Sequence, residues 1–247
     1  MRDFPMPRVV GHRGVRGHAP ENTLAGFRRA AEMGVRAVEF DVRRAADALV
    51  VIHDADLDRT TDGKGLVAAH TWAELEKLDA GAWFGAAFAG ARLATLETVL
   101  DCLAELGLSA NVEIKADDGA GDAAAFALGA EVAARVAERW PQDRPAPLLS
   151  SFDGAALAGA RSAVPGLARG LLFVRVPREW RARLEALDCT SLHAAHDKLD
   201  EQTVAAAHAG GWPVLVYTVN DPAAAARMDA WGVDAQCTDY PERLALT

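Results

Sequence analysis

Residues 148–173, LLSSFDGAALAGARSAVPGLARGLLF, contain a short apolar run, an alanine-rich stretch and a second short apolar run. The runs 148–152 and 168–173 have the length of strands, and the stretch 154–163 between them has the composition of a helix. The apolar residues of each run are largely continuous, as expected for strands that are buried on both faces of a parallel sheet. This segment therefore predicts one strand–helix–strand unit.

The same alternation continues over the whole chain of 247 residues. Eight expected strands with helices between them favour a single closed (β/α)8 barrel, the TIM barrel, over a doubly wound open sheet. The composition does not shift along the chain and no long linker interrupts it, so we expect one domain, residues 1–247. The expected strands are 8–12, 36–42, 110–115, 148–152, 168–173, 190–195, 214–219 and 234–238, and the expected helices are 23–33, 96–106, 122–139, 154–163, 201–209 and 222–231.

Helix starts are marked at two places. Asn22 and Asp221 each precede an expected helix, and both residue types are good N-caps. Pro222 fits the first position of the second of these helices.

A hairpin is expected after the second strand. Only six residues separate Val42 from the apolar run 49–53, too few for a parallel crossover. The run should therefore return antiparallel after a turn near 46–47. Counting outward from that turn pairs Ala45 with Ala48 and places His53 beside residue 40, at the level of the polar residues of the second strand.

The stretch 57–94 also breaks the alternation, and we interpret it as a small insertion beside the barrel mouth. It contains Trp83, Phe84 and Phe88. These aromatic side chains could line a substrate pocket, but we expect them to form the insertion's own small core.

Polar residues occur where expected strands end. His12 ends the first strand, Glu39 and Asp41 lie at the end of the second, and Glu113 and Lys115 lie at the end of the third. Active sites of TIM barrels lie at this end of the strands. Residues two apart share a face of a strand, and neighbouring strands are about 4.8 Å apart. We therefore expect the three carboxylates to converge.

Three converging carboxylates repel one another unless positive charge neutralises them. Arg13 and Lys115 could neutralise part of the charge, but a divalent cation does so better. An all-oxygen ligand set suits Mg²⁺ or Ca²⁺. The alternative is a buried ion-pair network without metal, for which Glu113 and Lys115 alone would suffice. Three acids at strand ends favour one bound divalent cation.

His12 and His53 are expected to reach the same rim from independent elements. Because imidazole titrates near neutral pH, such a pair can act as general base and general acid on opposite sides of one bond. Arg13, next to His12, offers a planar fork suited to phosphate oxygens. These groups, Lys115 and a metal suit a site where negative charge develops on a phosphate. The remaining histidines are interpreted as structural: His18, His70, His193, His196 and His208.

Several other functions are disfavoured. The net charge of −9 and the lack of a basic run argue against a nucleic-acid partner and against stable association with an anionic membrane. The glycine-rich segment 11–17 matches neither dinucleotide nor P-loop patterns, and residues 150–151 lack the glycines of a serine nucleophile elbow. We expect a cytoplasmic protein, because the chain shows no secretory or membrane-spanning segment. The cysteines, interpreted as small buried hydrophobes, are Cys102, Cys189 and Cys237.

The order of short motifs along the chain closely resembles that of the glycerophosphodiester phosphodiesterases. The resemblance covers essentially the whole length, and its N-terminal block is highly specific. The motifs are GHRG at 11–14, PENT at 20–23, EFDV at 39–42, VIHD at 51–54, LDRTT at 57–61, VEIK at 112–115, SSFD at 150–153, YTVN at 217–220 and TDYP at 238–241.

The resemblance implies a TIM barrel with a small insertion that hydrolyses glycerophosphodiesters to glycerol 3-phosphate and an alcohol. It also implies a mechanism in which the neighbouring glycerol hydroxyl, oriented by the metal, attacks the phosphate and water opens the resulting cyclic phosphate. Which histidine first acts as the base stays open. By their positions, Glu39, Asp41 and Glu113 match metal ligands, His12 and His53 match the acid–base pair, and Arg13 and Lys115 match phosphate-contacting or charge-balancing residues.

Two other functions are considered. A lysophospholipase D-like or phospholipase C-like activity would need an apolar surface that reaches a membrane, for which 82–88 is the candidate. A non-catalytic phosphodiester-binding protein should have lost a histidine or a metal carboxylate, and here each is present. Tyr217 stands where the family often has Trp, which could reshape the pocket around the leaving alcohol. The sequence leaves open that alcohol, the choice between Mg²⁺ and Ca²⁺, and the oligomeric state.

Overall fold

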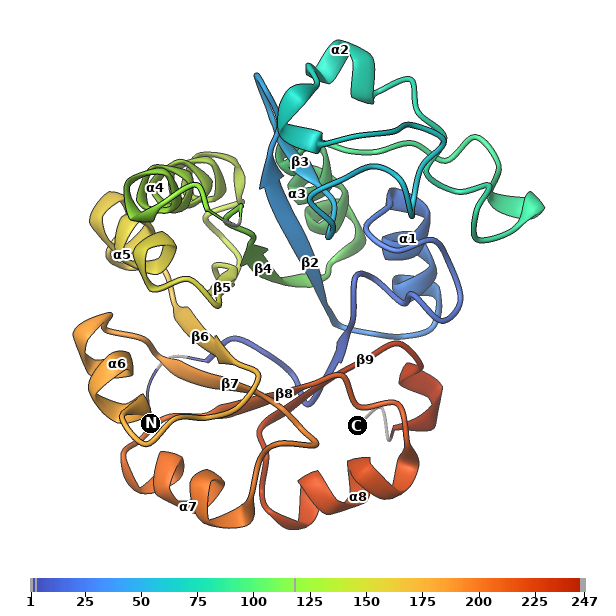
Figure 1. The fold of residues 1–247 in the computed structure, drawn as a ribbon. Helices are drawn as coiled ribbons and strands as arrows, with labels where there is room; N and C mark the ends of the chain where they lie inside the picture. Colours follow the sequence, from blue (N-terminus) through green and yellow to red (C-terminus); the bar gives the residue numbers. More distant parts are fainter. Residues whose placement is uncertain (1, 3, 118, 245–247) are drawn as a thin grey trace.

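The structure, a computed structural model, describes residues 2, 4–117 and 119–244. Eight parallel strands form a closed barrel, and β3 lies antiparallel beside β2 (Figure 1). The barrel closes because β1 pairs with both β2 and β9. The expected TIM barrel is thereby confirmed. The strands are β1 Val9–Gly11, β2 Ala37–Arg44, β3 Leu49–Val51, β4 Ser109–Ile114, β5 Leu148–Ser151, β6 Arg169–Phe173, β7 Ser191–Ala195, β8 Val214–Tyr217 and β9 Ala235–Thr238.

Helices α1 and α3–α8 surround the barrel (Figure 1). Six of them match expected helices, whereas α6 was not expected. Its seven residues bury only Trp180 and Leu184, which lie four apart, so the sequence shows one turn of apolar periodicity. The helices are α1 Leu24–Glu32, α2 Trp72–Leu75, α3 Leu96–Leu106, α4 Asp122–Arg139, α5 Gly154–Ala163, α6 Trp180–Ala186, α7 Glu201–Ala209 and α8 Pro222–Ala230, with short 3-10 helices η1 Val67–Ala69, η2 Ala86–Phe88 and η3 Pro241–Arg243.

One expected helix cap is wrong and one is confirmed. Thr23, not Asn22, caps α1, because the Thr23 hydroxyl accepts a hydrogen bond from the Gly26 amide. Asn22 instead has a positive φ of 58° and turns its side chain toward the barrel. Asp221 caps α8 as expected, and Pro222 is the first residue of that helix.

The hairpin has the expected register. Val42 pairs with Val51 across β2 and β3, and the Ala45 amide donates to the Ala48 carbonyl over 2.8 Å. Beyond the strand, the Ile52 amide donates to the Asp41 carbonyl over 3.0 Å. This last hydrogen bond holds residue 52 beside Asp41, so that the next residue, His53, lies at the rim of the barrel.

The insertion between β3 and α3 has an aliphatic core, which corrects the expectation that its aromatic residues form that core. Trp83 is 41% exposed, and Trp83, Phe84 and Phe88 stack edge to face on one another outside the cluster. Smaller aliphatic side chains form the interior instead. The core of the insertion consists of Ala45, Val50, Ile52, Leu57, Val67, Leu75, Ala80 and Leu93.

Apolar side chains fill the space between the barrel and its helices, and a smaller apolar cluster lies inside the barrel. The three cysteines are buried and unpaired, as expected. Among the described residues, no helix combines the length and the apolar character needed to cross a membrane.

Candidate active site

Three buried carboxylates lie close together on the neighbouring strands β2 and β4. Asp41 pairs in register with Glu113, and Glu39 lies two residues earlier on the same face of β2. One carboxylate oxygen from each residue lies within 4.8 Å of the others. Burial, together with the charge of Asp41, raises the pKa of Glu39 well above its usual value and that of Glu113 to about 6.

The positive charges nearby balance these acids only in part. Burial works to raise the pKa of Asp41, but Arg13, whose Nε lies 3.3 Å from Asp41 Oδ2, outweighs it together with His53, Lys115 and the hydrogen bond from Asn22, and the pKa is lowered. Lys115 Nζ donates to Glu113 Oε1 over 2.8 Å. Glu39 Oε1 is buried without a hydrogen-bond partner. An unpartnered carboxylate oxygen among three acids fits a hard divalent cation such as Mg²⁺ or Ca²⁺.

His12 follows β1 and is buried beside the acids. Its Nδ1 lies 2.6 Å from Asp239 Oδ1, and its Nε2 lies 3.9 Å from Glu39 Oε2. Asn220 in turn donates to the other Asp239 oxygen over 2.7 Å. Since a carboxylate accepts, the Nδ1 carries the proton and Nε2 keeps its lone pair. Burial lowers the pKa of His12 despite Asp239, so the neutral ring can act as a base.

His53 has the same type of partner. Its Nδ1 lies 2.6 Å from Asp54 Oδ1, and Arg59 Nε donates to Asp54 Oδ2 over 2.6 Å. Burial lowers the pKa of His53, against the opposing charge of Asp41. Both histidines therefore turn Nδ1 to a carboxylate and keep Nε2 for another ligand.

Glu21 connects the group of residues around His12 with the group around His53. It accepts hydrogen bonds from Arg13 over 2.7 Å and from Arg59 over 2.8 and 2.9 Å. Burial works to raise the pKa of Glu21, but the two guanidinium groups outweigh it and lower the pKa to about 2. A continuous set of ion pairs thus runs from Arg13 to the carboxylate that holds His53.

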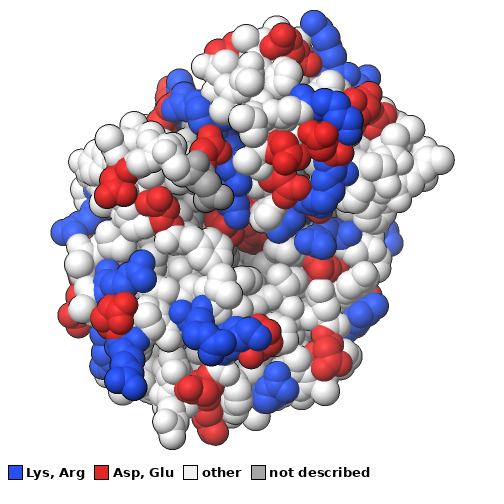
Figure 2. All heavy atoms as spheres, in the orientation of Figure 1, with Lys and Arg blue, Asp and Glu red and all other residues white. Residues whose placement is uncertain are grey.

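A cavity of about 270 Å³ collects these groups. Figure 2 shows this face of the molecule hollowed near its centre, with acidic side chains at the hollow. Of the seven residues singled out in the sequence, Asp41 alone does not line the cavity; it is only 1% exposed. The other six are His12, Arg13, Glu39, His53, Glu113 and Lys115, and the opposite wall includes Phe152, Leu172, Leu215 and Tyr217.

The sequence reasoning missed the residues that hold the histidines. Asp54, Glu21 and Arg59 were noted only as parts of motifs, and so were Asp239 and Asn220. One signal could have identified Asp239. It follows the last strand, which lies beside the first strand in a closed barrel, so its side chain had to reach the level of His12.

The fold and the site thus define a (β/α)8-barrel protein with two carboxylate-paired histidines and three buried acids at its rim. Residues 12–243 match the model of the glycerophosphoryl diester phosphodiesterase family. The chain belongs to this family.

Relatives cover nearly the whole chain. The chain is 34% identical to a glycerophosphodiester phosphodiesterase of Caldanaerobacter subterraneus, over 96% of the chain and 95% of the relative. It is 39% identical to an Oleispira antarctica phosphodiesterase solved with the product sn-glycerol-3-phosphate, with a TM-score of 0.90 over 97% of the chain and 95% of that structure. A structure from Silicibacter pomeroyi, a putative glycerophosphoryl diester phosphodiesterase by name, is 32% identical with a TM-score of 0.85, over 98% and 93%.

Proposed function

We propose that the chain hydrolyses glycerophosphodiesters to glycerol 3-phosphate and an alcohol, with His12 and His53 as the acid–base pair and a divalent cation as cofactor. One observation carries the proposal: both histidines, each held at Nδ1 by a carboxylate, line the same cavity as two of the three buried acids. The family match and the product bound in the Oleispira antarctica phosphodiesterase support the reaction. We further propose that residues 1–247 act as one domain that includes the insertion 57–94.

In this proposal Arg13 and Lys115 contact the phosphate oxygens. Nε2 of one histidine, the ring nitrogen that does not contact the carboxylate, removes the proton from the glycerol hydroxyl next to the phosphate. The new O–P bond forms as the bond between phosphorus and the leaving alcohol breaks. The other histidine enters this step as the imidazolium, with a proton on each ring nitrogen, and donates its Nε2 proton to that alcohol. Water then opens the cyclic phosphate with the two histidines in reversed roles, which returns both to their starting state.

Glu39, Asp41 and Glu113 would hold the cation. When bound, a divalent cation supplies positive charge that stabilises the negative charge developing on the phosphate. The unpartnered oxygen of Glu39 and the raised pKa of Glu113 support this assignment, because both indicate carboxylates whose charge the protein alone does not balance.

Release of glycerol 3-phosphate from glycerophosphocholine tests the proposal, with Mg²⁺, with Ca²⁺ and with a chelator. We expect release that requires a cation and that falls by about 10²–10⁴ in His12→Ala, the usual contribution of general acid–base catalysis. His70→Ala is the matched control, because His70 lies in the insertion and its ring contacts Lys64 and Glu74. Full activity in the presence of chelator would refute the requirement for a divalent cation. Full activity of His12→Ala would refute the role of His12 in acid–base catalysis.

One observation favours the alternative of a lysophospholipase D-like enzyme: Trp83 is 41% exposed in a segment, 80–91, that has no charged residue. The same assay with lysophosphatidylcholine separates the two functions. Faster cleavage of the acylated substrate than of glycerophosphocholine would favour the alternative.

A further inference from the structure

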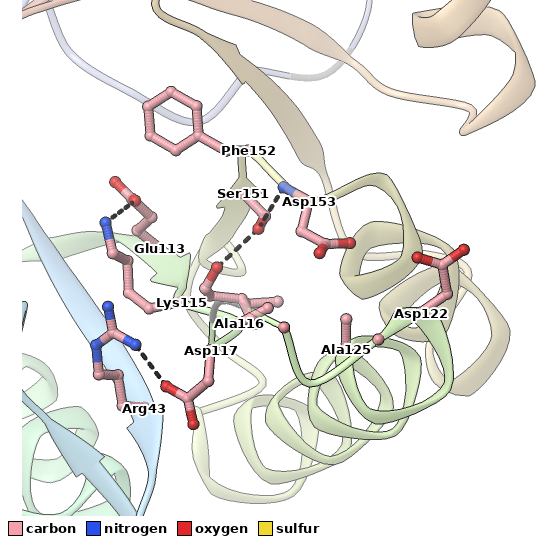
Figure 3. Close-up of a pocket in the computed structure, with 13 residues that line it drawn as sticks. Arg43, Glu113, Lys115, Ala116, Asp117, Asp122, Ala125, Ser151, Phe152 and Asp153 are labelled. Carbon is pink, nitrogen blue, oxygen red and sulfur yellow. Dashed lines mark hydrogen bonds and ion pairs between the residues drawn. The ribbon is translucent and has the colours of Figure 1, made fainter. Parts of the chain in front are cut away.

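A second cavity, of about 620 Å³, adjoins the catalytic one and has no role in the steps above. The two cavities share Glu113, Lys115 and Phe152. Figure 3 shows that the second cavity extends from these residues, at the ends of β4 and β5, toward the beginnings of α4 and α5. A group bonded to a phosphate at Lys115 therefore has an open path into this space.

The two cavities differ in size in a way that suggests their occupants. The catalytic cavity, of about 270 Å³, is less than half the size of its neighbour, of about 620 Å³. The proposed function places in the catalytic cavity the glycerol phosphate that all glycerophosphodiesters share. The larger neighbouring cavity is left for the part that varies, which is the alcohol.

The charges on the wall of the second cavity sum to a negative value. Lys115 and Glu113 belong to the catalytic site, where the proposed function assigns them to the phosphate and the cation. On the rest of the wall, Arg43 pairs with Asp117 over 2.7 Å. Two further carboxylates remain, and neither has an ion pair within the described part of the chain. Asp122 is exposed at the start of α4, and Asp153 caps α5, where its Oδ1 accepts hydrogen bonds from the Ala155 and Ala156 amides. Figure 3 places both near the starts of α4 and α5, across the cavity from Arg43 and Lys115.

An aromatic ring completes the wall. Phe152 is 40% exposed at the junction of the two cavities and packs edge to face on Tyr217, with ring centroids 6.0 Å apart. Lys115 Nζ already lies 5.8 Å from the centroid of the Phe152 ring. Aromatic faces attract cations, most of all ammonium groups that are weakly hydrated.

We propose that the second cavity binds the leaving alcohol and selects a cationic amino alcohol, such as choline or ethanolamine, over a neutral polyol. The inference rests on the proposed function, which supplies the phosphodiester whose alcohol enters the cavity. Phe152 would contact the ammonium group, and Asp122 and Asp153 would supply the negative potential that attracts it. The small side chains of Ala116 and Ala125 leave space for its methyl or methylene groups.

The test compares kcat/KM for two cationic substrates, glycerophosphocholine and glycerophosphoethanolamine, with that for two uncharged head groups, glycerophosphoglycerol and glycerophosphoinositol. We expect a preference for the cationic pair that decreases with rising salt concentration. Phe152→Leu should reduce the preference for choline about two- to fivefold, the value of an exposed cation–π contact. Asp122→Asn should reduce the preference for both cationic substrates about threefold.

Asp143→Asn is the matched control, because Asp143 is an exposed acid that lines neither cavity. Its substrate preference should equal that of the wild type. Equal kcat/KM for all four diesters, or a preference unchanged by Phe152→Leu and Asp122→Asn, would overturn the assignment while leaving the hydrolytic function intact.

Calorimetric titration of the His12→Ala protein with the same diesters separates this inference from the proposed function. Tighter binding of the cationic diesters without turnover by the wild type would support the cavity assignment and refute the reaction. Equal or undetectable binding of all four would overturn the assignment itself.

Discussion

At the scale of single residues, the two candidate catalytic histidines face a carboxylate with Nδ1, whereas His18 and His208 face one with Nε2. Each turns Nδ1 to a carboxylate over 2.6 Å, and each carboxylate is held by a further donor, Asn220 behind Asp239 and Arg59 behind Asp54. Such partners fix the tautomer and the orientation of the ring. The carboxylates are therefore positioning residues for the proposed chemistry.

We predict that Asp239→Asn lowers kcat by about 10–10³-fold without unfolding the protein. Asn220 would donate its hydrogen bond to the oxygen of the new side-chain amide at position 239. The NH₂ group of that amide would then face His12 Nδ1 and shift the ring proton to Nε2. The base would then lack its lone pair, the effect known for the Asp-to-Asn change in the serine protease triad. Turnover measured over a range of pH at saturating substrate checks this.

Asp234→Asn is the control for this prediction, because Asp234 pairs with His208 Nε2 over 2.9 Å away from the catalytic cavity. It should reduce stability with little effect on kcat. Equal kcat values for Asp239→Asn and the wild type would show that the carboxylate does not set the tautomer of His12.

The convergence of the three acids could be predicted from the sequence because strand geometry fixes it. Glu39 and Asp41 share a face by the two-residue period, and parallel register brings Glu113 beside them. The residues that hold the histidines depend on loops and rotamers instead. Arg59 reaches Glu21 across 38 positions of the chain through an irregular segment, and no periodicity predicts that contact.

At the scale of elements, the closest helix–helix contact explains part of the alanine-rich composition. A Cβ added at Gly129 of α4 would lie 1.8 Å from the Ala156 carbonyl oxygen of α5. A Cβ added at Gly159 of α5 would lie 1.9 Å from the Phe126 carbonyl oxygen of α4. The two backbones touch, so only small side chains fit along this contact.

We predict that Gly129→Ala destabilises the protein by about 1–3 kcal/mol, although alanine has the higher helix propensity, because the helices must separate to admit the methyl group. For a protein of this size the melting temperature should fall by about 2–12 °C. Gly166→Ala is the control, since an added Cβ there meets no atom within 4 Å. An unchanged or higher melting temperature of Gly129→Ala would contradict the tight contact.

Most elements could be predicted because their apolar runs are strong, whereas the insertion could not. Its 3-10 helices η1 and η2 have three residues each, too short for periodicity to show. Aromatic residues such as Trp83 are usually buried, so the sequence favoured them as a core; the aliphatic residues around Leu57 and Leu75 form it instead.

At the scale of the whole molecule, ring closure assembles the site from distant parts of the chain. The pairing of β1 with β9 brings Asp239 to His12, 227 positions away. The same closure encloses polar side chains inside the barrel and removes them from the molecular surface. His193 of β7 is one of these and is 0% exposed.

The enclosed His193 makes the global stability depend on pH. Its ring lies over Gly170 of β6, and its Nε2 is 3.0 Å from Ser191 Oγ. Burial alone lowers its pKa from 6.5 to about 3, with no contribution from a charged group. Between these two pH values the unfolded chain binds a proton at this residue and the folded chain does not. The free energy of unfolding therefore rises with pH in this window and reaches its full value above pH 6.5.

From pH 7 to pH 5 this one group should remove about 2 kcal/mol of stability, since each pH unit in the window costs about 1.4 kcal/mol. His193→Gln keeps a polar partner for Ser191 but does not titrate. Other groups titrate equally in both proteins, so we predict that the wild type loses about 2 kcal/mol more than the variant over this range. Urea unfolding of both proteins at pH 7, 6 and 5 measures the difference. If the free energy of unfolding fell equally with pH in both proteins, His193 would gain its proton while the barrel stays folded. Water would then reach the barrel interior.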